Sequence, residues 1–350
     1  MNKCKNCKGE IIFNPKEKGN QCKSCGSVFP IKYNYGLPKK TFEQSAVLNE
    51  DKPLNTLTNI KCNSCGASII VNKQQLQAQC PYCGDTSLVQ NNKSKLMNID
   101  SIIPFSFGKA EALKNFKAEV SGRFFAKKNL FKNVSESDIK GTYINAFVFD
   151  FVTTTTYKGV FTYSRTVRDK NGKTKTETVR KHVSGVFAKT FNNLTVEANS
   201  NFNQSDLTSI EPYKYDSAVE FQEDFMNGYM LEYQDSAFND CVKTAEDIMN
   251  ADIKKELLRK HNCDRIESID MSVSYQDRKY NYCLLPVYFF NVEDKKKGKT
   301  HKVVMNGQTA KVGKVPSDVG KILFVVFGII GIVAAIVLLS LLFVNNINKF

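Results

Sequence analysis

Eight of the eleven cysteines in the chain form four pairs of the type Cys-x2-Cys, a spacing suited to metal binding. Two residues between thiolates form a tight turn that presents both sulfurs to one ion, and two such turns supply the four sulfurs that structural zinc prefers. The pairs stand in two sets, and 14 residues separate the pairs within each set. We therefore predict two structural zinc ions per chain, bound by Cys4, Cys7, Cys22 and Cys25 and by Cys62, Cys65, Cys80 and Cys83.

The second cysteine set is the first shifted by 58 residues, and other positions repeat with it. The repeated residues are Lys3, Ile11, Ile12, Asn14, Gln21 and Gly26, which recur as Lys61, Ile69, Ile70, Asn72, Gln79 and Gly84. Because hydrophobic positions are included, the pattern indicates an internal duplication of a folded unit and not of spacing alone. We predict two small β zinc ribbons with rubredoxin-like knuckles, at 1–36 and 59–90, joined by a linker at 37–58.

Each ribbon is too small to bury a core of its own, so metal binding is expected to drive its folding, with about 10–16 kcal/mol per site. The 14-residue gap fits a β-hairpin with strand cores at 11–13 and 69–71. A glycine follows the second cysteine in three knuckles, at Gly26, Gly66 and Gly84, where it lets the backbone turn. Lys8 takes this place in the first knuckle.

Two other readings of the eight cysteines have less support. Disulfides belong to oxidising compartments, and the N-terminal MNKCKNCKGE has no apolar stretch of the kind found in a signal peptide. A rubredoxin-type iron site uses similar knuckles, but the short gap favours zinc. Cys241, Cys263 and Cys283 have no paired spacing, so we expect buried thiols.

An uncharged run of 23 residues lies near the C-terminus at 322–344. As a helix it would be roughly 34 Å long, enough to cross a hydrocarbon core of about 30 Å. Four lysines precede the run within 20 residues, and Lys349 alone follows it. By the positive-inside rule, we expect a tail-anchored, single-span protein of the cell membrane, with the bulk of the chain in the cytoplasm and a short C-terminal tail outside.

The residues between ribbons and span, 101–318, are expected to form one α+β domain with antiparallel strands. Apolar spacing predicts helices at 109–127, 217–233 and 237–260. The helix at 217–233 would carry a core stripe of Phe221, Phe225, Tyr229 and Tyr233. Strands are predicted at 142–168, 266–275, 280–292 and 300–312, with hairpin turns at 169–172 and at Asn306-Gly307. The polar stretch 86–100 is expected to be a linker.

The chain resembles a group of bacterial membrane proteins with TFIIB-type zinc ribbons, some of which carry a label taken from the primosomal replication-restart helicase. Besides the duplicated Cys-x2-Cys pairs, the resemblance rests on Ile103-Pro104-Phe105, Gly141-Thr142-Tyr143-Ile144, Glu211-Pro212-Tyr213, Leu285-Pro286-Val287 and Met305-Asn306-Gly307-Gln308-Thr309. It implies the same plan of two ribbons, an α+β domain and a C-terminal anchor. It implies no activity and no catalytic residues.

The sequence favours a protein that is not an enzyme. The string from Gly307 to Lys314 differs from a phosphate-binding loop, because its gap is one residue too long and Val315 replaces the hydroxyl residue. The three histidines are far apart and have no ligand spacing. With 42% hydrophobic and 24% charged residues the chain can bury a core and is not disordered.

We expect a membrane-tethered adaptor that recruits another protein at the cytoplasmic face through its ribbons. The alternative is a membrane-anchored nucleic-acid-binding protein, since the net charge is +14 and a basic strip with stacking aromatics can hold single strands. The residues that suggest this strip are Lys3, Lys5, Lys8, Lys16, Lys18, Lys23, Lys32, Lys39 and Lys40, with Phe13, Phe29, Tyr33 and Tyr35.

Overall fold

The computed structural model of the chain describes residues 3–49, 52–53, 57–72, 79–91, 95–96, 98–168, 172–294 and 298–347. These residues form a mixed α+β structure, as the sequence predicts, with four α-helices among them. The helices are α1 (Lys109–Gly122), α2 (Gln204–Ile210), α3 (Phe238–His261) and α4 (Val319–Ile347). Short 3-10 turns occur at η1 (Phe42–Asn49), η2 (Lys128–Phe131), η3 (Glu136–Asp138), η4 (Tyr215–Ser217) and η5 (Glu223–Met226).

Within the described residues, eleven strands belong to one large sheet. Their bounds are β4 (Lys40–Thr41), β6 (Leu57–Cys62), β7 (Ser68–Asn72), β8 (Leu88–Asn91), β10 (Ser101–Ile102), β11 (Ile139–Arg168), β12 (Thr174–Glu197), β13 (Val219–Glu220), β14 (Met230–Glu232), β15 (Arg265–Asp294) and β16 (Lys299–Asn306). The order along the sheet is β13-β10-β15-β11-β14-β7-β6-β8, with β12 on β11 and with β16 and β4 on β15. Most pairs are antiparallel, but β10 on β15 and β14 on β11 are parallel, so the sheet is mixed and not antiparallel throughout.

Two smaller sheets lie near the N-terminus. One is the three-stranded sheet of β1 (Ile11–Asn14), β2 (Gly19–Cys22) and β3 (Val28–Pro30). The other pairs β5 (Lys52–Pro53) with β9 (Lys95–Leu96). Since β8 and β9 fall within 86–100, the stretch expected as a linker contains paired strands.

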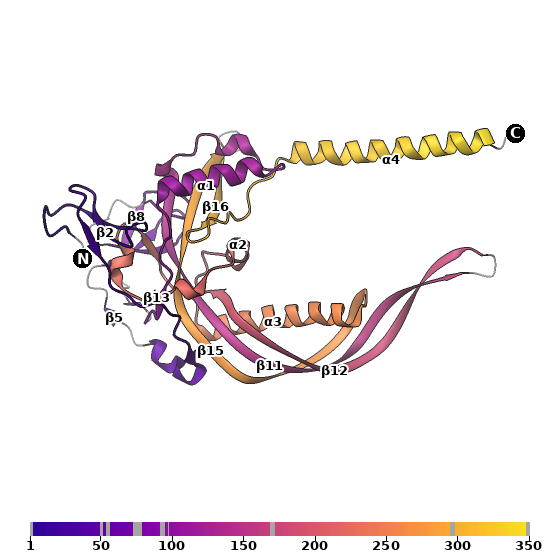
Figure 1. The fold of residues 1–350 in the computed structure, drawn as a ribbon, viewed down its shortest axis with the longest axis horizontal. Helices are drawn as coiled ribbons and strands as arrows, with labels where there is room; N and C mark the ends of the chain where they lie inside the picture. The colour runs from indigo at the N-terminus through magenta and orange to yellow at the C-terminus, as the bar shows by residue number, and fades with distance from the viewer. Residues whose placement is uncertain are drawn as a thin grey trace.

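Three long strands, β11, β12 and β15, curve together and carry α3 along their concave side (Figure 1). Residues on the two faces of β11 alternate, as the period of a strand requires. Phe147, Phe149 and Phe151 enter the larger core, which also contains α1 and α3. Ile144 and Val148, together with Ala146, enter a second core on the other face, where α2 packs. The strand is therefore buried on both sides near its start, which explains its almost continuous apolar run.

Helix α3 matches the prediction for 237–260 to within one residue at each end. Its buried residues recur every four positions and face the strands: Cys241, Ala245, Met249, Ile253 and Leu257. The helix ends at Asn262, which has a left-handed φ of 45° and donates its N–H to the carbonyls of Leu258 and Arg259. Basic residues in the last turn oppose the negative end of the helix dipole.

The predicted helix at 217–233 is wrong. The segment instead forms β13, η5 and β14, and Gly228 has a φ of 84° that no α-helix accommodates. Its aromatic residues nevertheless belong to the core: Phe225 and Tyr229 are buried, and Phe221 and Tyr233 pack against the same cluster. The four-residue spacing of these aromatics therefore predicted their burial correctly, but it predicted a helix where the chain forms short strands and a 3-10 turn.

The predicted helix at 109–127 ends earlier, at Gly122. The Arg123 guanidinium donates to the carbonyls of Val312 and Gly313, both at 2.6 Å, and the backbone is extended at Arg123 and then turns at 124–125. As a result Phe124, which lies within the predicted helix, is 65% exposed.

Two of the predicted strands, 266–275 and 280–292, are one continuous strand, β15. Its pairing with β11 shifts where Val152 faces Asp277 and Thr153 faces Tyr275, so that one extra residue of β15 is accommodated as a bulge. The chain turns directly after Asn306, as predicted, but the turn covers 307–309. The predicted strand at 300–312 is wrong in its second half, because β16 ends at Asn306 and only an isolated antiparallel bridge joins Met305 to Val312. Residues 169–171 of the other predicted turn lie outside the described residues.

Helix α4 leaves the body and runs away from it (Figure 1). Its part from Val319 to Ser340 is long and apolar enough to cross a membrane and has no contacts that bury it. The predicted span, 322–344, lies within this helix.

Candidate metal centres

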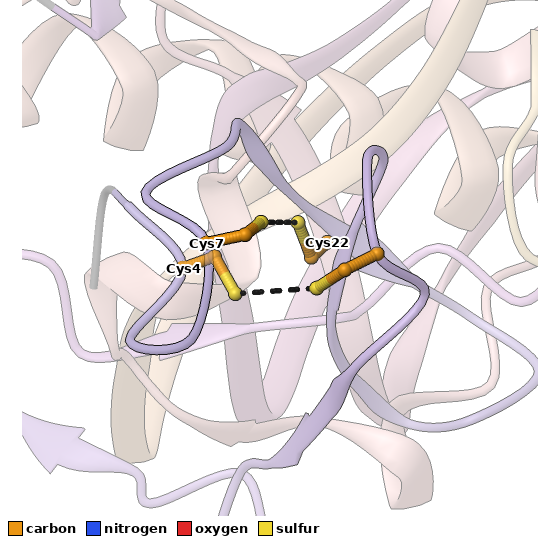
Figure 2. Close-up of side chains that lie close together, drawn as sticks. Cys4, Cys7 and Cys22 are labelled. Atoms are coloured by element: carbon orange, nitrogen blue, oxygen red, sulfur yellow. Dashed lines mark hydrogen bonds between the residues drawn. The ribbon is translucent and has the colours of Figure 1, made fainter.

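The first cysteine set comes together in one cluster, as predicted. Cys4 Sγ lies 3.6 Å from Cys25 Sγ, and Cys7 Sγ lies 3.4 Å from Cys22 Sγ (Figure 2). All four sulfurs are within 4.8 Å of one another. A thiolate–zinc distance of about 2.3 Å with tetrahedral angles would place sulfurs about 3.8 Å apart. The cluster therefore has the size needed for one tetrahedral ion.

The second set forms a matching cluster. The sulfurs of Cys62 and Cys83, and those of Cys65 and Cys80, are each 3.6 Å apart. All eleven cysteines of the chain are free thiols. Two groups of four sulfurs can thus each hold a metal ion.

The four knuckles share one backbone pattern. The residue after the second cysteine has a left-handed φ in every case: 62° at Lys8, 74° at Gly26, 77° at Gly66 and 79° at Gly84. The N–H of this residue donates to the carbonyl of the first cysteine at 2.9–3.0 Å. The N–H of the first cysteine in turn donates to the carbonyl five residues later, that of Gly9, Ser27, Ala67 or Asp85. This pattern of two hydrogen bonds places the residue after the second cysteine in the left-handed region, which explains why glycine stands at three of these four positions.

A side-chain pair links the two knuckles of each cluster. In the first, Asn6 Nδ2 donates to Ser27 Oγ at 2.9 Å, and in the second the Ser64 hydroxyl donates to the Asp85 carboxylate. Both pairs occupy positions related by the 58-residue shift, although the residue types differ. The sequence comparison missed these pairs because it looked for identical residues at positions 58 apart. What the two clusters share is a hydrogen bond between the residue two places after the first cysteine and the residue two places after the last.

The first cysteine of each knuckle is buried, and the second is exposed or half-buried. Backbone N–H groups of Cys25 and Ser24 lower the pKa of Cys22, and the Ser27 hydroxyl and backbone lower the pKa of Cys25 to about 6. Burial instead raises the pKa of Cys83 to about 11. A bound cation would overcome this cost by stabilising the thiolates.

The predicted first ribbon, which holds the first cysteine cluster, docks on the body through the segment that was predicted to be a helix. Phe13, on β1, packs edge-on against Phe225 at 5.2 Å between ring centroids. The N–H of Phe13 donates to the carbonyl of Asn227 at 2.8 Å. A Cβ on Gly228 would meet Ile12 at 2.8 Å, so this contact needs glycine for space as well as for φ.

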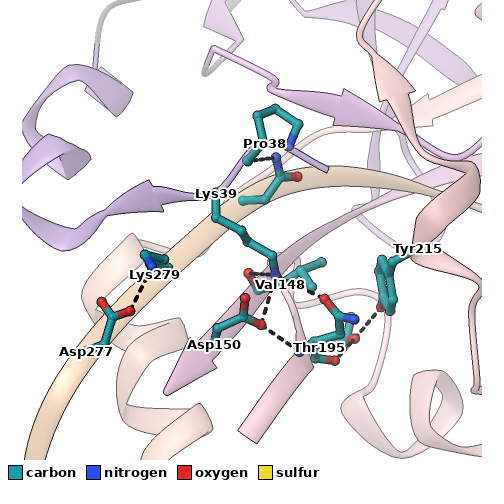
Figure 3. A network of polar contacts seen from close by, with 10 residues as sticks. Pro38, Lys39, Val148, Asp150, Thr195, Tyr215, Asp277 and Lys279 are labelled. Atoms are coloured by element: carbon teal, nitrogen blue, oxygen red, sulfur yellow. Dashed lines mark hydrogen bonds and ion pairs between the residues drawn. The ribbon is translucent and has the colours of Figure 1, made fainter. Parts of the chain in front are cut away.

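Residues that follow the first ribbon are fixed to the central strands. The Lys39 ammonium donates to Asp150 Oδ1 and to Asn193 Oδ1, both at 3.1 Å, and to the Val148 carbonyl at 3.4 Å (Figure 3). Burial lowers the pKa of Lys39, an effect that Asp150 opposes. Lys40 forms an ion pair with Asp100 and, in β4, pairs with Tyr280 of β15.

The predicted second ribbon, which holds the second cysteine cluster, is built into the large sheet. Its strand β7 pairs with β14 through Ile70 and Leu231, and β14 pairs with β11. Tyr82, within the last knuckle, packs on Phe289 at 5.4 Å. The segment 223–232 therefore contacts both ribbons, the first through η5 and the second through β14.

Of the basic strip suggested by the sequence, seven lysines are exposed: Lys3, Lys5, Lys8, Lys16, Lys18, Lys23 and Lys32. Lys39 and Lys40 are instead half-buried in ion pairs. Among the aromatics, Phe13 is buried, Tyr33 packs on Phe225, and Tyr35 is 59% exposed.

Comparisons with known proteins give no assignment, since no protein-family model, no curated protein and no solved structure matches the chain. The class that fold and site define is a mixed α+β protein with two four-cysteine clusters that could each hold a metal ion and, among the residues that the structure describes, one helix of membrane-spanning length.

Replacing Gly66 by alanine is expected to weaken metal binding by about 1 kcal/mol, or roughly fivefold, because an L-residue is strained at its left-handed φ. Lys8→Gly is expected to strengthen binding at the other cluster by a similar factor, since it removes that strain. Competition with a chelating dye measures both effects.

Gly172→Ala is the matched control. Gly172 has a φ of 75° and open space around it, but it lies next to the β11–β12 turn, away from both clusters. Its substitution should leave metal affinity unchanged. Equal affinities for all four proteins would contradict the role assigned to the left-handed residue.

Proposed function

We propose that the chain is a membrane-anchored adaptor, in which two structural zinc ions hold a pair of ribbons that recruit another protein. The sulfur-only donor sets favour zinc, which takes four thiolates in closed structural sites. The shared backbone pattern and the 58-residue shift support an origin of the ribbons by duplication. We propose a role in binding, without catalysis.

The arrangement of ribbon and anchor carries this proposal. The first ribbon, with β2 and the N-terminus, lies at one end of the molecule, whereas α4 starts beside α1 and runs toward the opposite end (Figure 1). If α4 spans a bilayer, the ribbon is held away from it and is open to a partner in the aqueous phase. Both Val28 on β3 and Tyr35 near the end of the ribbon are exposed, at 40% and 59%.

The strongly shifted carboxyl and phenol groups support a role without catalysis. Glu232, Tyr143 and Tyr282 have pKa values raised well above their usual range by burial. All three are inside the core, where Tyr282 donates to Asn145 and Tyr143 donates to the Phe225 carbonyl. Their shifts follow from packing and do not mark a cleft.

We propose that the body lies on the cytoplasmic side of the membrane. Lys314 and Lys321 stand directly before the apolar run, and Lys302 and Lys311 lie further back. The latter two are engaged within the fold, Lys302 with Asp206 at 3.0 Å and Lys311 with the Glu211 carbonyl. Positive charge before the span and little after it favours this orientation.

Site-specific photo-crosslinking in native membranes tests the adaptor. A photoreactive phenylalanine analogue at Val28 or Tyr35 is expected to give one protein adduct, which disappears when Cys22→Ser removes the first metal site. The matched control is Val186 on β12, which is also 59% exposed. If no adduct forms, if Val186 gives the same adduct, or if the adduct survives Cys22→Ser, the adaptor proposal fails.

Nucleic-acid binding is the second candidate, favoured by the seven exposed lysines of the first ribbon. Two of the four aromatics that would stack on bases are used inside the protein, so any affinity should be mainly electrostatic. Binding of a labelled oligonucleotide should then fall steeply as salt increases. Absence of binding at low salt eliminates this candidate.

A further inference from the structure

The loop that joins α1 to η2 exposes two adjacent aromatic side chains. Phe124 is 65% exposed and Phe125 is 41% exposed, and their rings meet edge-on at 5.0 Å between centroids. They follow Gly122, where α1 ends, so the buried face of that helix does not include them. Two neighbouring exposed phenylalanines have an energetic cost in water and call for a partner surface.

Backbone bonds hold this pair beside the start of α4. The N–H of Asp318 donates to the Phe125 carbonyl at 2.7 Å, and the N–H of Lys127 donates to the Pro316 carbonyl at 2.9 Å. Between these bonds, Ala126 and Ser317 form an antiparallel bridge. The aromatic pair is therefore at the level of residues 317–319, immediately before α4 begins at Val319.

Charged groups lie close to the pair in both the body and the first turn of α4. A cavity of about 700 Å³ opens next to it, lined by charged residues that include Lys127, Lys128, Asp294, Asp318 and Lys321. Lys321 is also the last charged residue before the apolar run. Aromatic rings and charged groups that lie together where an apolar helix starts are typical of the interface between hydrocarbon and headgroups.

We propose that Phe124 and Phe125 insert into the interfacial layer of the bilayer that α4 crosses, and so seat the body on the membrane surface. The inference rests on the proposed anchoring by α4. It adds a second contact with the same bilayer, made by the folded body and rigidly linked to the helix. The orientation of the body is then set by this contact and not only by the residues before α4.

The absence of tryptophan from the chain allows a direct test. Single tryptophans are introduced into the full-length protein by Phe124→Trp, by Phe327→Trp within α4, and by Tyr35→Trp at the far end. Each variant is reconstituted in phosphatidylcholine and phosphatidylglycerol vesicles, with and without bromine on the acyl chains near the glycerol. Phe124→Trp is expected to emit at shorter wavelength than Tyr35→Trp and to lose roughly half of its intensity with brominated lipid.

Tyr35→Trp is the matched control, since it is an aromatic exchange at a site of similar exposure, 59%. It should show no quenching. If Phe327→Trp is quenched but Phe124→Trp behaves like Tyr35→Trp, the inference is overturned and the anchoring by α4 stands. If Phe327→Trp is not quenched, the anchoring fails and the inference fails with it. Equal quenching of Tyr35→Trp and Phe124→Trp also overturns the inference, because the contact would then not be specific to this loop.

Discussion

Cys22→Ser should reduce the metal content from two ions per chain to one and unfold the first ribbon. Cys22 is 1% exposed and contributes one of four sulfurs, so a serine leaves three ligands and a buried hydroxyl. The binding free energy of a structural zinc site, about 10–16 kcal/mol, exceeds what three short strands can supply. Metal analysis of the purified protein measures the stoichiometry, and hydrogen exchange measures the protection of residues 3–30.

The rest of the body should stay folded in this variant. The first ribbon docks mainly through Phe13 on Phe225 and through β4, whereas β11 and β15 pair with each other along most of their length. Protection in β11 and β15 is therefore expected to persist. Cys263→Ser serves as control, because this half-buried thiol is outside both clusters and its loss should leave two ions bound. Protection of residues 3–30 that is unchanged in Cys22→Ser would show that the ribbon folds without metal.

Glu232→Gln should stabilise the protein, increasingly so as the pH rises. Glu232 is fully buried in β14, and its Oε1 has no hydrogen-bond partner among the residues that the structure describes. Burial raises its pKa well above the usual value, helped by the nearby Asp235 and opposed by the Asn145 N–H and Lys302. Folding thus favours the protonated form of the Glu232 carboxyl.

The sign follows from the direction of this shift. A carboxyl whose pKa is higher in the folded state contributes full stability below its unfolded pKa, about 4.3, and that stability is lost as the pH rises toward the folded pKa. The loss is about 1.4 kcal/mol per pH unit in this window. Because glutamine does not titrate, the free energy of unfolding of Glu232→Gln should exceed that of the unmodified protein by a gap that widens as the pH rises above the unfolded pKa toward the folded pKa.

Urea unfolding at pH 6, 7 and 8 measures the gap, at pH values where the thiolate sites are expected to retain metal. Glu220→Gln is the matched control, because Glu220 is an exposed glutamate on the short strand β13, which precedes β14 in the chain. The difference in free energy of unfolding between Glu220→Gln and the unmodified protein should be the same at all three pH values. A constant gap for Glu232→Gln as well would mean that the carboxyl is ionised in the folded protein.

The metal ligands were accessible from the sequence because their signal is local. Each knuckle is specified by six consecutive residues, and the structure brings together the same eight cysteines that the spacing predicts. Helix α3 was equally accessible, since its buried positions recur every four residues and no glycine or proline interrupts it. The apolar run in α4 could be predicted from its length and composition alone.

Long-range pairing explains what the sequence did not reveal. The segment around Phe225 and Gly228 has a helical spacing of aromatics, but its shape is determined by Phe13 and Ile70, which are more than 150 residues away in the chain. The polar stretch around Gln276 looks like a turn, yet it is a bulge that continues β15 along β11. No local pattern contains the identity of a distant partner strand.

The way in which both ends of the chain attach to β15 has a mechanical consequence. The residues after the first ribbon join this strand through β4, which makes two residue pairs, whereas the segment before α4 is reached through β16, which makes eight. When a partner bound at the ribbon is pulled while the other end is fixed in a bilayer, the load runs along β15, because β4 and β16 pair with the same edge of this strand, opposite β11. The two residue pairs of β4 should therefore break before the eight of β16. Under tension the ribbon would then separate from the body, while α4 stays attached to it.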